Sequence, residues 1–149
     1  MSEELTGTEV VSALATQLRN RFTESQFAKI YKNKPVQSQV TPCIFIHLIE
    51  TQHTPDIAHY AWWSHSLDIR CHPGKMCTNI NSWAQTLSPI ITECVEYITI
   101  AGHRVKSNGV ICRVEDDVLH ILVNYRYRVL RKLDAVPLME SLEYGQSIK

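Results

Sequence analysis

The sequence predicts an α+β fold in which a mostly antiparallel β-sheet with long strands packs against two α-helices on one face. Two segments alternate apolar and polar residues over about a dozen positions, which indicates long strands. Two others repeat apolar residues at intervals of three and four, which indicates amphipathic helices. We expect one domain over residues 1–149, with flexible ends at 1–7 and 145–149.

The N-terminal helix is expected over residues 8–22, where the apolar residues fall on one face and Thr8 can serve as the N-cap. A short strand is expected at Phe27–Tyr31, ended by Pro35. Residues 36–42 have the composition of a polar linker. The helix needs a sheet or a partner to cover its apolar face.

Two further strands are expected after the linker. In the segment Cys43–Glu50 the residues at both odd and even positions are apolar, apart from His47. This is typical of a strand that is buried on both faces or lies at an assembly interface. The polar residues 51–56 are expected to form a loop. The next strand, about residues 58–71, alternates two faces along its length and is long for a small domain.

The second helix is expected at about residues 79–98, where an apolar stripe again follows the helical period. Pro89 lies inside this stretch. Proline removes one backbone donor and clashes with the preceding turn, so we expect a kink or a break, with Ser88 and Pro89 opening the second half.

Three strands are expected in the last part of the chain, in TIAGHRV, in VICRVE and at Val118–Leu130. Asn108–Gly109 is a turn signal, and Asp116–Asp117 is a candidate two-residue hairpin turn. The strand after that hairpin would be roughly 40 Å long at ~3.3 Å per residue. A final turn or two of helix is expected at Val136–Tyr144.

Arginine side chains gather on one face of this last strand. Arg126 and Arg128 lie opposite Tyr125 and Tyr127, and further basic residues follow at 131 and 132. A nucleic-acid site is poorly supported, because the aromatic residues lie on the other face and the chain is neutral. A solvated strand end and a charged contact to a neighbouring subunit remain as alternatives.

Adjacent tryptophans mark the second long strand. Trp62 and Trp63 point to opposite faces, so they cannot belong to the same core. Tyr60 lies on the side of Trp62, which places aromatic surface on an otherwise polar face. Such surface is typical of protein–protein contact. A helix that covers this face is the alternative.

The composition limits the classes of function. Lys+Arg and Asp+Glu balance at 15 each, so no overall basic field attracts nucleic acid or anionic lipid. No segment has the length or hydropathy of a membrane span, and the acidic N-terminus lacks signal-peptide features. We therefore expect a protein made in a cytoplasm, whose five cysteines are reduced and mostly act as small apolar side chains.

Catalytic and metal-binding patterns are weak. His47 and His65 could approach each other if their strands pair, but a histidine within a strand is more often a hydrogen-bonding structural residue. Cys71, His72 and Cys77 have no second ligand pair elsewhere, as a zinc site normally requires. The five glycines form no phosphate-binding loop. We expect no enzyme activity, catalytic residue, metal or cofactor.

Four motifs in order resemble one known family. They are TPCIFIHLI, HSLDIRCHP, the second helix, and VEDDVLHILVNYRYRV. In this order and spacing they resemble the tail terminator, or tail completion, proteins of tailed bacteriophages, most closely those of prophages with contractile tails and of R-type bacteriocins. The resemblance covers roughly residues 5–144. The chain departs from the family pattern at Asp117, where glycine is expected, at Pro89, and in the low charge of its second helix.

The resemblance implies a non-enzymatic virion protein, assembled in the host bacterial cytoplasm. Copies would form a hexameric ring on the head-proximal end of the tail tube, end its polymerisation and dock the head. Its partners would be other copies, the tube protein, a head–tail connector and the last sheath ring, with no membrane or specific nucleic-acid binding, although DNA can pass through the ring. The alternatives are another connector or tube ring protein, or a small metal-binding enzyme.

Such a ring predicts where subunits touch. A strand that outruns its own core can pair with or pack on the next subunit, and a closed ring leaves no free sheet edge. The loops expected at 52–57, 74–78 and 106–109 would meet the tube or the connector. The expected interface residues are Tyr60, Trp62, Arg70, Asn108, Arg126, Arg128 and Arg131.

Overall fold

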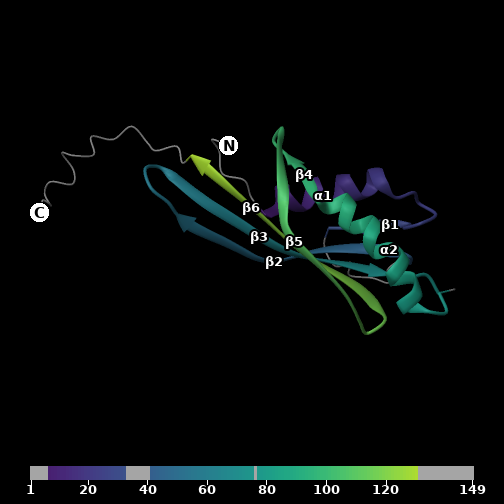
Figure 1. Ribbon diagram of the computed structural model, residues 1–149. Coiled ribbons are helices and arrows are strands. Elements are labelled where there is room, and N and C mark those ends of the chain that lie inside the picture. Colours follow the sequence, from purple (N-terminus) through teal and green to yellow (C-terminus); the bar gives the residue numbers. More distant parts are fainter. Residues whose placement is uncertain (1–6, 33–40, 76, 131–149) are drawn as a thin grey trace, which may run out of the picture.

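Six strands form one sheet, and two helices cover one of its faces (Figure 1). This computed structural model describes residues 7–32, 41–75 and 77–130. The sheet order is β1-β2-β3-β6-β5-β4, with β1 and β2 parallel and all other neighbours antiparallel. The α+β class and the order of the elements are confirmed. The elements are α1 (Gly7–Arg21), β1 (Lys29–Tyr31), β2 (Cys43–Pro55), β3 (Tyr60–His72), α2 (Ile80–Val95), β4 (Tyr97–Ile100), β5 (His103–Glu115) and β6 (Val118–Leu130).

Helix α1 follows the predicted periodicity. Its apolar residues Val10, Leu14 and Leu18 are fully buried. They face α2 and the strands β1, β2 and β4, so the helix contributes one side of the core. The helix begins at Gly7, so Thr8 lies in its first turn and is not the N-cap that the sequence suggested.

Helix α2 runs without a break through Pro89, so the predicted break is wrong. The Ser88 hydroxyl donates a hydrogen bond of 2.6 Å to the Ala84 carbonyl in the turn before the proline. At the start of the helix, the Asn79 side chain accepts a bond from the Ser82 amide at 3.1 Å. The helix ends at Val95, and Ile98 of the predicted stripe is instead buried in β4.

Strand β2 is longer than predicted. The expected loop at 51–56 is wrong, because Thr51–Pro55 continue the strand and pair with Ala61–His65 of β3. A bulge between Leu48 and Glu50 shifts the register. Beyond it the residues are exposed, so no hydrophobic period marks this part as a strand.

Of the two turns predicted near β5, the structure confirms the one that follows the strand and contradicts the one at Asn108–Gly109. The Asp116–Asp117 hairpin is confirmed, and both residues have positive φ, 52° and 60°. The turn expected at Asn108–Gly109 is wrong, because β5 continues through it with an irregularity between Ser107 and Val110. The chain turns earlier, between β4 and β5, at Ala101 and Gly102, with φ 50° and 81°.

The core lies between the helices and the face of the sheet that they cover. Tyr125 of β6 is fully buried there, and its hydroxyl donates a 2.6 Å hydrogen bond to the Val95 carbonyl at the end of α2. Cys43, Cys71 and Cys94 are buried, as predicted for small apolar side chains. Burial raises the pKa of the Cys43 and Cys94 thiols to about 11, so both stay protonated at neutral pH.

Three strands extend beyond the part of the sheet that the helices cover, as Figure 1 shows at the left. We call this the projecting arm: residues 50–55 of β2, 60–66 of β3 and 124–130 of β6, with Tyr125 at its base still bonded to the end of α2. The predicted linker at 36–42 lies mostly outside the described residues. The predicted C-terminal helix at 136–144 and the flexible ends lie outside them too, apart from Gly7.

Candidate assembly surface

The outer face of the projecting arm, turned away from the helices, carries stacked arginine and aromatic side chains. The guanidinium of Arg126 lies 4.1 Å from the centre of the Trp62 ring. That of Arg128 lies 4.0 Å from the centre of the Tyr60 ring and 5.9 Å from that of Trp62. The two strands therefore interlock through cation–π contacts, each worth about 0.5–1 kcal/mol at an exposed site. We call these four residues the arginine–aromatic group.

An acidic residue at the tip of the arm fixes one of the arginines. The Asp56 carboxylate lies 3.0 Å from Nη2 of Arg128. The backbone N–H of Ile57, together with Arg128, lowers the pKa of Asp56, so this carboxylate is charged at neutral pH. Among the described residues no carboxylate forms such a pair with Arg126. Sequence reasoning missed this pair, because Asp56 and Arg128 lie far apart in the chain.

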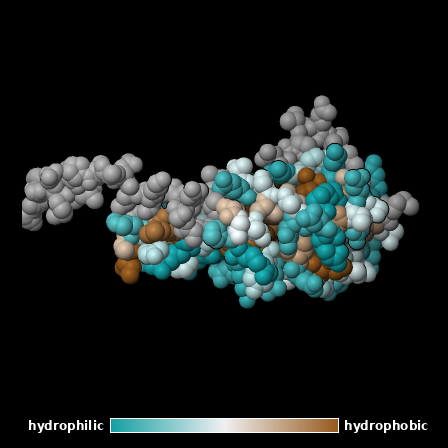
Figure 2. Space-filling view, turned by 90° about the horizontal axis from the view of Figure 1, so that it is seen from above, coloured by the Kyte–Doolittle hydropathy of each residue, from teal (hydrophilic) through white to brown (hydrophobic). Residues whose placement is uncertain are grey.

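Polar side chains continue the outer face from the arginine–aromatic group. The Asn124 amide donates to the hydroxyls of Ser64 and Ser66, at 2.8 and 2.9 Å. Figure 2 shows that the arm is narrow and mostly hydrophilic, with hydrophobic residues at its tip. Ile57, in the turn between β2 and β3, is 75% exposed, and Leu130 at the end of β6 is 41% exposed. The arm therefore presents both polar and apolar groups to a partner.

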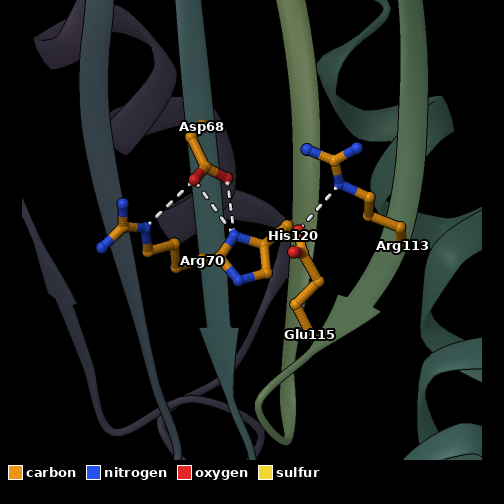
Figure 3. Close-up of polar contacts among 5 residues, drawn as sticks. All are labelled: Asp68, Arg70, Arg113, Glu115 and His120. Atoms are coloured by element: carbon orange, nitrogen blue, oxygen red, sulfur yellow. Dashed lines mark hydrogen bonds and ion pairs between the residues drawn. The ribbon is translucent and has the colours of Figure 1, made fainter.

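The base of the outer face holds a buried carboxylate (Figure 3). Asp68 of β3 accepts hydrogen bonds from Nε of Arg70 at 3.0 Å and from Nδ1 of His120 of β6 at 3.0 and 3.2 Å. Because a buried carboxylate needs donors, these bonds tie β3 to β6. A second pair in the same view, Arg113 with Glu115 at 3.0 Å, is exposed.

The opposite face of the arm holds a histidine among aromatic rings. His65 is fully buried, with Nδ1 3.1 Å from the Thr51 hydroxyl and Nε2 2.8 Å from the Tyr127 hydroxyl. Burial lowers the pKa of His65, so its ring is neutral at neutral pH. Trp63 stacks on this ring with centroids 6.3 Å apart, and His53 lies 4.6 Å from Trp63. Nε1 of Trp63 is buried without a hydrogen-bond partner in the described part of the chain.

The suggested metal or catalytic groups are not brought together. His47 pairs with Asp68 and His65 pairs with Thr51 across the bulge, so the two histidines lie on opposite faces of the sheet. Cys71 is buried in the core, whereas the neighbouring His72 points to the other face. Within residues 7–32, 41–75 and 77–130 no three His, Cys, Asp or Glu side chains are grouped as metal ligands.

Four of the expected interface residues lie together. Tyr60, Trp62, Arg126 and Arg128 form the arginine–aromatic group, and no described helix covers them. Arg70 lies at the other end of β3, bound to Asp68, and Asn108 lies in the irregular part of β5. Arg131 lies outside the described residues. The expected loops 52–57 and 106–109 are largely strand.

A small α+β domain with a projecting arm and an exposed arginine–aromatic group has the form of a subunit built for assembly. The comparison with protein families agrees. A model described as phage tail terminator protein matches residues 9–137, and the chain belongs to this family. It is therefore a structural protein of the phage tail, of the kind that completes it.

Other comparisons add little. No curated protein matches the chain. Twenty-two chains of solved structures resemble it. One of them is 9% identical over 88% of this chain and 100% of that chain, with a TM-score of 0.42. Among the described helices none is long and apolar enough to cross a membrane.

Proposed function

We propose that copies of this chain form a ring, of six subunits, that caps the head-proximal end of a phage tail tube. The ring ends tube polymerisation and offers the surface on which the head docks. Its partners are the tube protein, a head–tail connector and, in a contractile tail, the last sheath ring. The protein has no enzymatic role. Membership of the tail terminator family and the shape of the projecting arm support this function.

The projecting arm carries the proposal. Its outer face holds the arginine–aromatic group, and aromatic and arginine side chains are the residues that most often dominate protein–protein interfaces. Its outer strand, β2, also has an open edge, because β1 pairs only with Cys43–Phe45 and residues 46–55 pair with β3 on one side but with no described strand on the other. An open edge of this length favours contact with another chain.

A strain that lacks the gene tests the function. Electron microscopy of its particles should show tails of excess length, or tails without heads, and the wild-type gene supplied in trans should restore both. A gene with Trp62→Ala should restore neither, whereas one with Tyr97→Ala should restore both, because Tyr97 forms a similar arginine contact away from the arm. Tails of normal length with heads attached in the deletion strain would contradict the proposal.

Two other functions predict different results with purified protein. A tube protein would polymerise into long tubes on its own, whereas a terminator forms discrete rings. A metal-binding enzyme would carry zinc in stoichiometric amounts, which elemental analysis detects.

A further inference from the structure

A groove of about 800 Å³ lies beside the open edge of β2, at the end of the sheet away from the arm tip. Helix α1 forms one wall with Val11 and Ser12, and the β2 residues Ile46 and Leu48 form the floor. The groove opens where β1 ends, because only Cys43–Phe45 of β2 pair with β1.

The groove combines an apolar floor with a basic rim. Val11 and Ile46 are buried on the side of the helices, Phe45 is buried on the opposite face of β2 beside Arg70, and Lys32 and Arg70 line the border of the groove. Nε of Arg70 binds Asp68, but its side chain is 43% exposed, and Lys32 is exposed. No Asp or Glu is among the described residues that line the groove. This chemistry fits an apolar segment that carries carboxylates.

The C-terminal segment of the chain has that chemistry. Residues 133–144, LDAVPLMESLEY, contain six large apolar side chains and three acidic ones, and no basic side chain. The segment follows closely on Leu130, the last residue of β6, which lies at the tip of the projecting arm (Figure 1). It therefore begins where a neighbouring copy would lie in a ring.

The segment starts too far away to fill the groove of its own chain. Arg70 at the groove pairs with His120, which lies ten residues before Leu130 along β6, so the two points are roughly 33 Å apart. Val136 lies six residues beyond Leu130 and reaches at most about 20 Å, even fully extended. Leu133 and Val136 therefore cannot return to the groove of their own chain. Leu142 and Tyr144, twelve and fourteen residues beyond Leu130, are within reach of it, so the test must distinguish contacts within one copy from contacts between copies.

We propose that residues 133–144 of one copy dock in the groove of the next copy, with the leucines on the apolar floor and the carboxylates near Lys32 and Arg70. This inference rests on the proposed ring, since the neighbour must be held beside the arm. It adds a second contact between copies. Each copy places its C-terminal segment in the groove of one neighbour, and its own groove binds the segment of the neighbour on the other side.

Cross-linking of the full-length protein tests the docking. A photo-reactive phenylalanine replaces Leu138, and the protein is prepared from a mixture of ¹⁴N and ¹⁵N chains. Mass spectrometry of the peptides should then join Leu138 of one isotope to residues 8–12 or 45–48 of the other. Cross-links only within one isotope, or only outside the groove, overturn the docking. If residues 1–6 or 33–40 fill the groove instead, the cross-links should fall only outside it.

Substitutions at both partners give the matched controls. Leu138→Asp should reduce the groove cross-link from a probe placed at Leu142 by at least about tenfold, because it removes a buried leucine. Lys32→Glu should reduce it by about two- to fivefold, the range of an exposed ion pair. Ser147→Asp, outside residues 133–144, and Lys75→Glu, outside the groove lining, should leave it unchanged. Equal yields in all four variants overturn the docking.

The outcome separates this inference from the ring itself. Wild-type protein that stays monomeric by native mass contradicts both. Rings that form while the Leu138 cross-links fall elsewhere contradict only the docking.

Discussion

The guanidinium of Arg126 lies over the Trp62 indole, 4.1 Å from the ring centre, although Arg126 pairs across the strands with Ser64 and not with Trp62. The arginine therefore leans along β6 toward the tip of the arm. Arg128 leans in the same direction, over Tyr60. This shared lean gives the outer face a continuous surface of rings and charges.

Trp62→Ala should separate assembly from folding. The side chain is only half-buried on an uncovered face, so the isolated fold should lose little beyond the ~0.5–1 kcal/mol of an exposed cation–π contact. Ring assembly should weaken by about 2 kcal/mol or more, as for a central interface residue. Native mass spectrometry measures the effect on ring assembly, and the melting temperature measures the effect on folding.

Tyr97→Ala is the matched control for this variant. Tyr97 lies on β4 with the Arg104 guanidinium 4.1 Å from its ring centre, the same geometry away from the arm. It should lower stability as little as Trp62→Ala and leave the ring intact. If both variants lose the ring equally, the arginine–aromatic group has no special role.

Asp68→Asn should destabilise the fold more than Glu115→Gln, a change in the exposed ion pair of Arg113 and Glu115. Asp68 is buried and accepts bonds from Arg70 and His120, so neutralising it weakens charge-assisted bonds worth about 1.5–3 kcal/mol. Glu115→Gln alters a pair exposed on both sides and should cost less than about 1 kcal/mol. Urea unfolding of the two variants gives the comparison, and equal losses would show that the Asp68 bonds do not stabilise β3 against β6.

The buried imidazole of His65 should make stability depend on pH. Burial holds the pKa of His65 below its ordinary value, so the unfolded chain binds a proton that the folded chain does not. The free energy of unfolding should therefore fall as pH drops below about 6.5, the pKa of an unperturbed histidine, and stay level above it.

His65→Gln tests the origin of this pH dependence, since glutamine can bond both hydroxyls without titrating. Thermal melts at several pH values should give a shallower acid slope for the variant than for the wild type. His72 also has a lowered pKa, mainly through burial and then through Arg70, so His72→Gln measures the remaining contribution. An unchanged slope in His65→Gln would contradict the assignment.

Asp117→Gly should stabilise the β5–β6 hairpin. Asp117 has φ 60°, a conformation that costs most residues about 1–2 kcal/mol and glycine almost nothing. Because aspartate tolerates this region better than most residues, we expect a gain of up to about 1 kcal/mol in the free energy of unfolding. A lower melting temperature in this variant would show that the Asp117 side chain has a stabilising role.

The sequence predicted best those elements whose two faces differ in environment. β6 runs from Val118 to Leu130 as expected, because its buried and exposed residues alternate along the whole strand. α1 was recognised for the same reason, with one apolar face buried. The opposite faces of Trp62 and Trp63 also follow from strand geometry alone.

The missed features depend on long-range pairing. Residues 51–55 are exposed on both faces, so only their pairing with β3 makes them a strand. Asn108–Gly109 and Ala101–Gly102 both resemble turns, and the pairing of β5 with β6 decides between them. The partnership of Asp56 with Arg128 joins residues far apart in the chain, so no local pattern could reveal it.

The native mass of the purified full-length protein tests the central claim most directly. We expect a closed ring with the mass of six chains at micromolar concentration, and smaller species for Trp62→Ala. A wild-type protein that is monomeric at every concentration, or that grows into open-ended tubes, would contradict the proposal that this chain terminates a tail as a ring.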